Sequence, residues 1–134
     1  MDKVIRMCIV HDMGEAFTGD IPVFQKTPDH EAREEALLRD WVNGLPESYR
    51  RELGDLYAEM EQRQTLESKI YKALDGIEAL IQHNLSDIDT WLPGEYTLQQ
   101  VYAQDRVGFS KYLTALRQEV LEDTLQKIAD AETK

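Results

Sequence analysis

The sequence is poor in cysteine, in basic residues and in long apolar runs. Cys8 is the one cysteine among 134 residues, so no disulfide can form within the chain, which fits a reducing compartment. No apolar run approaches the roughly 20 residues that a membrane-spanning helix needs. Residues 1–10 carry Lys3 and Arg6 and lack a small-residue cleavage site, unlike a signal peptide. These absences predict a cytoplasmic protein with no membrane partner.

Basic residues are far fewer than acidic residues in this chain. Fifteen Lys and Arg residues stand against 26 Asp and Glu residues, which gives a formal net charge of −11. Because proteins that bind nucleic acid neutralise phosphates with Lys and Arg, this balance argues against a nucleic-acid partner. It leaves room for a small phosphorylated ligand, because a bound divalent cation can supply positive charge locally.

Apolar residues recur at helical spacing almost throughout, and no parallel-sheet pattern is present. The length fits a single domain over residues 1–134. Val4 to Val10 is apolar nearly all round, so this helix is expected to be buried. Residues 84–97 are expected to be a loop, because Pro93-Gly94 is a strong turn signal, and residues 130–134 a frayed tail. Further helix starts are expected at Pro28, Pro46, Thr65 and Thr97 and after Gly108.

The segment "CIVHDMGEAFTGDIP" ends an apolar helix in His11 and Asp12. Imidazole and carboxylate together suit Mn, Fe, Co, Zn or Mg-like ions. For an isolated His-Asp pair the simpler interpretation is that Asp12 caps a turn and His11 is a partly buried histidine. The pair alone does not decide between these interpretations.

Asp75 lies beside the apolar stripe of a later helix. A carboxylate near the core side of a helix is costly unless it is paired or binds a metal. Lys72, one turn earlier, could pair with it, and a metal ion would explain its position equally well. Lys72 could also meet a phosphate group, which makes it a candidate substrate-binding residue.

The two segments together carry a resemblance to a known family. "VIRMCIVHDMGEAFTGDIP", followed by "TLESKIYKALDGIEALIQ", resembles the HD-domain metal-dependent phosphohydrolases. Within them, the chain is most similar to the branch of HD-domain-containing protein 2 and the 5′-deoxynucleotidases. The similarity extends from about residue 3 to about residue 117.

The resemblance implies an all-α, HD-domain-like helical bundle that binds one divalent metal ion (Mn, Co, Mg, Zn, Fe or Ni). The implied metal ligands are His11 and Asp12, which match the family's His-Asp pair, and Asp75, which matches its late aspartate. Glu15 and Asp20 match two further acids that are implicated in hydrolysis and in placing the substrate. An acid at such a position can take a proton from water or protonate a leaving oxygen. Without the motif, Glu15 would be an exposed carboxylate and Asp20 a turn former.

One departure from the family concerns the first metal-ligating histidine, which lies well upstream of the His-Asp pair. This sequence begins ten residues before His11, so that histidine and an arginine near it have no counterpart. The chain therefore resembles an N-terminally shortened member. His30 and His83 are poorly placed to replace the missing ligand.

The leading functional hypothesis is a metal-dependent phosphomonoesterase that hydrolyses 5′-deoxynucleoside monophosphates. Two alternatives stay open: a non-catalytic helical module of the HD type, and an HD hydrolase that acts on another phosphate ester. The resemblance also implies a homodimer, although the amphipathic last helix fits packing within one chain equally well.

Overall fold

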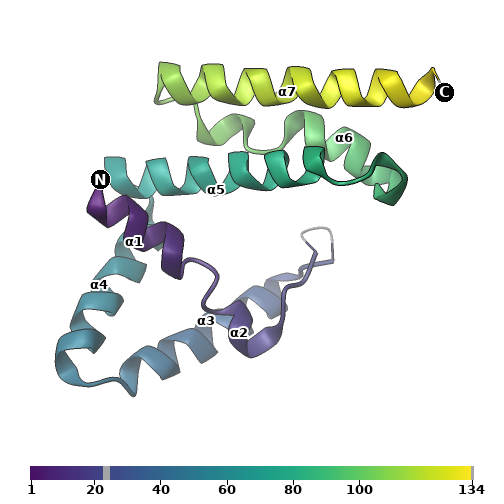
Figure 1. The fold of residues 1–134 in the computed structure, drawn as a ribbon. Helices are drawn as coiled ribbons and strands as arrows, with labels where there is room; N and C mark the ends of the chain where they lie inside the picture. The colour runs from purple at the N-terminus through teal and green to yellow at the C-terminus, as the bar shows by residue number, and fades with distance from the viewer. Residues whose placement is uncertain (23–24, 134) are drawn as a thin grey trace. The chain divides into compact units, whose positions relative to one another are not determined.

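The computed structural model describes residues 1–22 and 25–133, which form helices joined by turns and short irregular segments, without a strand among these residues (Figure 1). This confirms the all-α prediction. Contacts divide the chain into two compact units, residues 1–68 and 69–134. The prediction of one domain over residues 1–134 stays a prediction. The elements in chain order are α1 (Asp2–Val10), α2 (Glu15–Thr18), α3 (Pro28–Asn43), α4 (Glu47–Gln62), α5 (Leu66–Leu85), η1 (Ile88–Thr90), α6 (Pro93–Val101), η2 (Gln104–Arg106) and α7 (Lys111–Glu132).

The helix starts of the first unit follow the predicted capping signals. Thr27 precedes α3 with an extended backbone, and its Oγ1 accepts the backbone N–H of His30 at 3.3 Å. Pro28 occupies the first helical position, where its missing N–H has no helical partner to lose. Pro46 instead stands at the N-cap, directly before the first residue of α4, and Arg63 ends that helix in the left-handed conformation.

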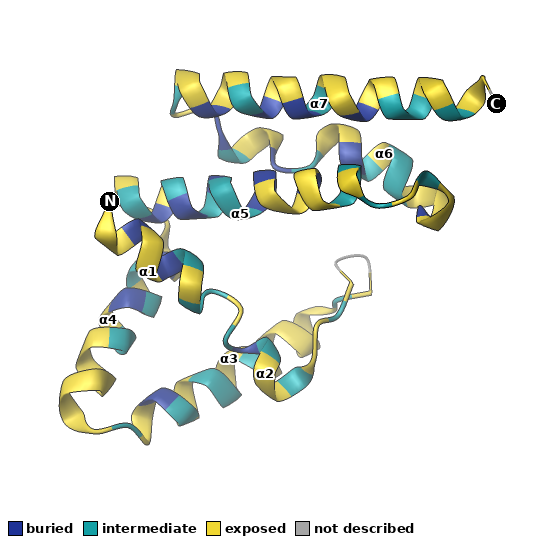
Figure 2. Ribbon diagram, in the orientation of Figure 1, coloured by how far each residue is buried: buried dark blue, intermediate teal, exposed yellow. Residues whose placement is uncertain are grey.

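Helix α1 is fastened to α4, although it is less buried than expected. The Tyr57 hydroxyl donates to the carbonyl of Val10 at 2.9 Å. Val4 and Met7 are buried, whereas Ile5 and Ile9 remain 50% and 73% exposed. The prediction of a buried first helix is therefore wrong for one of its faces, which Figure 2 shows as alternating colours along α1. An all-round apolar sequence does not specify which face packs.

The second unit has a continuous apolar core. The predicted stripe of α5 supplies Ala73, Ile77 and Leu80, all at most 2% exposed. They pack with Val107, Leu113 and Val120, and with the partly buried Leu74, Tyr102 and Leu116. Ser110 caps α7, since its Oγ accepts the Leu113 N–H at 3.3 Å.

The predicted loop over residues 84–97 is largely wrong. Helix α5 continues to Leu85, and α6 begins at Pro93 rather than at Thr97. Pro93 acts as a helix-starting residue, and the Glu95 carboxylate accepts the Leu92 N–H at 2.7 Å. The Pro-Gly pair therefore starts a helix, a role that proline fits as well as it fits a turn.

The predicted frayed tail is also wrong over most of its length. Helix α7 continues to Glu132, and Lys134 lies outside the described residues. A hydrogen bond between polar side chains lies along this last stretch of α7, where Gln126 Nε2 donates to Asp130 Oδ1 at 2.7 Å.

Arg117 of α7 holds the segment that follows α6. Its guanidinium donates to the carbonyls of Gln100 and Tyr102, at 2.7 and 3.1 Å, and the residue is 4% exposed. Burial lowers the pKa of Arg117. Gln100 belongs to the last turn of α6 and Tyr102 is its C-cap, and a cation at this end is favoured by the helix dipole.

Two glycines within helices should respond oppositely to alanine. A Cβ at Gly54 of α4 meets nothing within 4 Å, so Gly54→Ala should stabilise the protein by about 0.5–1 kcal/mol through helix propensity. A Cβ at Gly76 of α5 would lie 2.6 Å from the Ala103 Cβ, so Gly76→Ala should destabilise it by about 1–3 kcal/mol. Urea unfolding of the two variants beside the wild type measures both changes. Equal shifts in the two variants would contradict the close packing at Gly76.

Candidate metal and hydrolytic site

His11 lies at the C-terminal end of α1, and its ring orientation is set by hydrogen bonding. Its Nδ1 lies 2.7 Å from the carbonyl oxygen of Cys8. Because a carbonyl oxygen can only accept a hydrogen bond, Nδ1 carries the hydrogen, and Nε2 of the neutral ring offers its lone pair. This backbone contact is typical of metal-binding histidines, in which the second nitrogen is held by a carbonyl or a carboxylate.

Asp12 faces the other nitrogen of that ring. Its Oδ2 lies 3.1 Å from His11 Nε2, and the two side chains are 61% and 25% exposed. At this distance the lone pair of His11 Nε2 and the carboxylate of Asp12 repel one another unless a positive charge lies between them. That charge can be a proton on Nε2 or a bound metal ion. The pair therefore fits a divalent ion both in the chemistry of its donors and in their orientation.

Glu15 begins α2, one turn beyond the pair. Its backbone N–H donates to the carbonyl of Asp12 at 3.0 Å. Burial and the charges of Asp12 and Asp20 raise the pKa of Glu15, and Lys26 opposes this shift. A carboxyl group with a raised pKa can exchange protons closer to neutral pH, which suits general acid–base chemistry.

Lys26 and Glu34 form the other side of the Glu15 environment. Lys26 Nζ lies 3.0 Å from Glu34 Oε2 and 4.0 Å from Glu15 Oε1. Gly14 allows this approach, because a Cβ there would lie 2.7 Å from Glu34 Cγ. Helix α3 thus brings the acid Glu34 to Glu15, and Lys26, just before that helix, supplies a cation, an arrangement that the motif alone does not reveal.

Asp20 follows a glycine turn that ends α2. Gly19 has a φ of 80°, a conformation that favours glycine, and its N–H donates to the Glu15 carbonyl at 2.7 Å. Asp20 is exposed, and its charge acts on Glu15. This placement agrees with an assisting acid, a role that stays a prediction.

Asp75 and Lys72 belong to the second unit, on α5. Lys72 Nζ donates to Asp75 Oδ2 at 2.8 Å, so the predicted pairing is present. Arg106 of η2 also approaches this carboxylate, with Nη1 3.7 Å from Oδ2. Sequence reasoning missed Arg106. Gly76, directly after Asp75, was a usable signal, because a glycine inside a helix often marks a close approach.

The predicted metal ligands are divided between the units, with His11 and Asp12 in the first and Asp75 in the second. Within each unit, the described residues contain no group of three His, Cys, Asp or Glu side chains that could hold a metal ion. The remaining histidines have other roles. His30 accepts the Thr27 N–H at the start of α3, and His83 stacks on Trp91 with ring centroids 4.3 Å apart.

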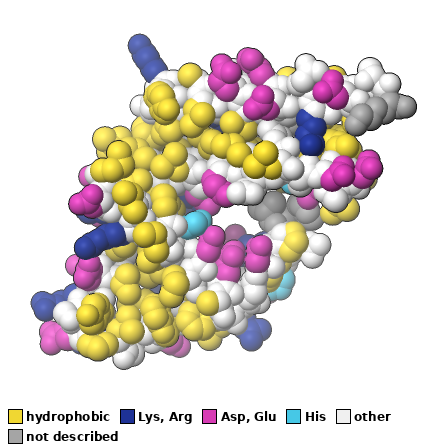
Figure 3. All heavy atoms as spheres, viewed as in Figure 1, with side chains coloured by type: hydrophobic (Ala, Val, Ile, Leu, Met, Phe, Trp, Pro, Cys, Tyr) yellow, Lys and Arg dark blue, Asp and Glu magenta, His cyan; other side chains and the backbone are white. Residues whose placement is uncertain are grey.

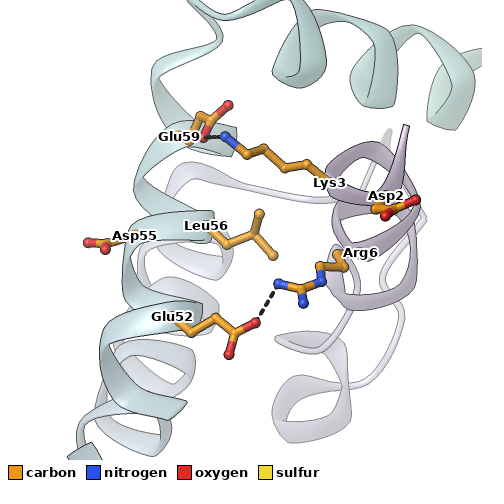
Figure 4. A pocket seen from close by; sticks show the side chains of 7 residues that line it. All are labelled: Asp2, Lys3, Arg6, Glu52, Asp55, Leu56 and Glu59. Atoms are coloured by element: carbon orange, nitrogen blue, oxygen red, sulfur yellow. Dashed lines mark hydrogen bonds and ion pairs between the residues drawn. The ribbon is translucent and has the colours of Figure 1, made fainter. Parts of the chain in front are cut away.

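A hollow of about 430 Å³ lies between α1 and α4, apart from the predicted residues (Figure 4). Its charged side chains reach across it in pairs: Lys3 binds Glu59 at 2.9 Å, and Arg6 binds Glu52. These two ion pairs fasten α1, the helix that leads into His11, to α4. On the face drawn in Figure 3, acidic side chains gather in several groups, as expected for a chain with 26 Asp and Glu residues against 15 Lys and Arg residues.

Comparison with protein families matches residues 1–117 to the HD domain. The matched range includes His11 and Asp12, Glu15 and Asp20, and Asp75. The chain belongs to the HD domain family. This confirms the resemblance found in the two sequence motifs.

Curated relatives of this HD domain carry one name. The chain is 37% identical over 83 residues to the human 5′-deoxynucleotidase HDDC2, an alignment that covers 60% of this chain and 41% of that protein. The mouse protein of that name is 39% identical over 83 residues, with 60% and 42% covered. The Dictyostelium discoideum protein is 32% identical over 82 residues, with 60% and 43% covered. The chain thus spans less than half the length of these relatives.

Two further findings concern solved structures and membrane-spanning helices. No solved structure matches the chain significantly. Among its described residues, no helix is long and apolar enough to cross a membrane.

Proposed function

We propose that the chain is the HD domain of a metal-dependent phosphomonoesterase that hydrolyses 5′-deoxynucleoside monophosphates to nucleoside and phosphate. The observation that carries the proposal is the orientation of His11, whose Nδ1 is bound to the Cys8 carbonyl while Nε2 faces Asp12. The names of the curated relatives support the substrate class.

The proposed ligands of one divalent ion are His11, Asp12 and Asp75. The ion can be Mn, Co, Mg, Zn, Fe or Ni, since imidazole and carboxylate suit this group of metals. When bound, such an ion supplies positive charge that polarises the phosphoryl oxygens and makes a bound water more acidic. The assignment of Asp75 rests on the order of the motifs in the sequence.

Glu15 is the proposed general acid–base residue. In the ionised form it accepts a proton from the attacking water, and the protonated form can then pass that proton to the departing O5′ of the nucleoside. The charge of Asp20 helps to keep the proton affinity of Glu15 high. Lys72 is proposed to bind the substrate phosphate with its ammonium group.

The location, the small-molecule partner and the oligomeric state are proposed from the composition and from the family. A cytoplasmic location agrees with a single cysteine among 134 residues. The small-molecule partner is a nucleoside monophosphate. A homodimer agrees with apolar residues that stay exposed on α7, with Tyr112 at 76% and Leu125 at 45%.

Phosphate release tests the proposed function directly. The purified chain is incubated with the deoxynucleoside 5′-monophosphates, with and without Mn or Co, and inorganic phosphate is measured. We expect release that depends on added metal and is abolished by a chelator. Ribonucleoside monophosphates, a triphosphate and a cyclic nucleotide are assayed in parallel. Release from those compounds alone would replace the proposed substrate class, and release from no compound would refute the proposed activity.

A further inference from the structure

Arg106 of η2 has one buried donor atom, Nη1, that lies near Asp75 but makes no hydrogen bond to the described residues. A guanidinium carries five N–H donors in a rigid plane. Its Nη1 is buried without a hydrogen-bond acceptor among the described residues, and the side chain as a whole stays 22% exposed. A buried donor without an acceptor is rare in native structures and calls for an explanation such as a bound ion.

The position of Arg106 is nonetheless well defined by its neighbours. The guanidinium carbon lies 4.7 Å from the centre of the Tyr102 ring, a cation–π contact. The backbone of Tyr102 is held by Arg117, as described above. Ala103 turns the chain with a φ of 58°, directly against Gly76. The fold therefore places a guanidinium against α5 and leaves its Nη1 without a hydrogen-bond acceptor among the described residues.

Two cations approach the carboxylate of Asp75. Lys72 lies 2.8 Å and Arg106 lies 3.7 Å from the same carboxylate oxygen, Oδ2. Two cations share one carboxylate in a chain whose net charge is −11. If Asp75 also binds a divalent ion, the local excess of positive charge increases. A phosphate dianion would offset that excess, and its oxygens would accept from both side chains.

We propose that Arg106 binds the phosphate group of the substrate together with Lys72, beside Asp75. This inference rests on the proposed function for the identity of the substrate, and it adds a residue that the sequence motifs do not mark. A guanidinium is suited to this task because its fork of donors matches two phosphate oxygens. Both side chains stay partly exposed, at 22% and 23%, so a ligand can reach them.

Orthophosphate binding tests the inference without requiring turnover. Calorimetry on the purified chain measures its Kd with and without Mn. We expect Arg106→Met to weaken orthophosphate binding by about 10-fold to 100-fold, the range for losing a charge-assisted hydrogen bond. Arg106→Lys should recover part of the loss, and Lys72→Met should weaken binding similarly. Lys69→Met, which removes an exposed cation one turn earlier on α5, should change nothing.

The outcomes separate this inference from other roles of Arg106. An unchanged orthophosphate Kd in Arg106→Met would overturn it. A loss of Mn affinity measured without phosphate, with orthophosphate binding intact, would make Arg106 a positioning residue for Asp75. If Arg106→Met does not fold, Arg106→Gln replaces it, since glutamine keeps a polar side chain without the charge, and wild-type phosphate affinity in Arg106→Gln would overturn the inference instead. If the chain is active, the expected signature is a raised KM with a smaller change in kcat. If the chain is inactive, the orthophosphate Kd values still decide whether Arg106 binds phosphate.

Discussion

Replacing Asp12 by alanine should lower metal-dependent phosphate release by about a thousandfold or more. Asp12 faces His11 Nε2 at 3.1 Å, so its loss removes the carboxylate from the proposed ion. A divalent ion contributes several kcal/mol to charge stabilisation in the transition state, and each 1.36 kcal/mol corresponds to about tenfold in rate. Phosphate release and metal content, measured on one preparation, show whether activity and metal are lost together.

The matched control is Asp40→Ala, which removes an exposed carboxylate from α3 in the same unit. It should retain both the activity and the metal. His11→Ala should repeat the result of Asp12→Ala, because the proposal makes both side chains ligands of one ion. An Asp12→Ala protein that keeps its metal and its rate would contradict the assignment of the pair.

Replacing Glu15 by glutamine should lower kcat by about 10²–10⁴-fold, the usual contribution of a general acid–base residue. Metal content should stay near that of the wild type, because Glu15 is not a proposed ligand. This separates Glu15 from Asp12, whose loss should remove both metal and activity. Glu35→Gln is the matched control, since it removes an exposed carboxylate from α3. Equal rates for Glu15→Gln and the wild type would exclude Glu15 from the proton transfer.

The pH dependence gives a second, signed test of the same residue. Burial, Asp12 and Asp20 raise the pKa of Glu15, and the cation of Lys26 lowers it. Lys26→Met should therefore raise that pKa further. Because Glu15 must be ionised to accept a proton, the acid limb of the pH–rate profile should move to higher pH. A shift to lower pH would mean that Lys26 does not act on Glu15 through its charge.

Several parts of the candidate site could be read from local sequence. The helix starts at Pro28 and Pro46 follow from proline chemistry, and the structure confirms them. The glycine turn before Asp20 is equally local, since it depends on the φ of one residue. In contrast, Pro93-Gly94 was misread, because proline fits both a turn and a helix start and the surrounding bonds decide.

The environment of Glu15 could not be predicted in this way. Glu34 reaches it because α2 packs on α3, and Gly14 permits that packing, while Lys26 lies just before α3 and pairs with Glu34. Local patterns do not specify which helices pack or at what distance. For the same reason, the sequence marked Gly76 only as an unusual residue within a helix, while the structure shows what approaches it.

The sequence by itself determined that this chain is helical, that it carries the paired His11 and Asp12, and that it belongs with the HD domains. These features depend on residue types at short spacing, which elementary helix geometry turns directly into structure. Only the tertiary structure decided which face of α1 is buried and which cations surround Asp75. Arg106 lies 31 residues after Asp75 in the chain, and its approach follows from the packing of a whole unit.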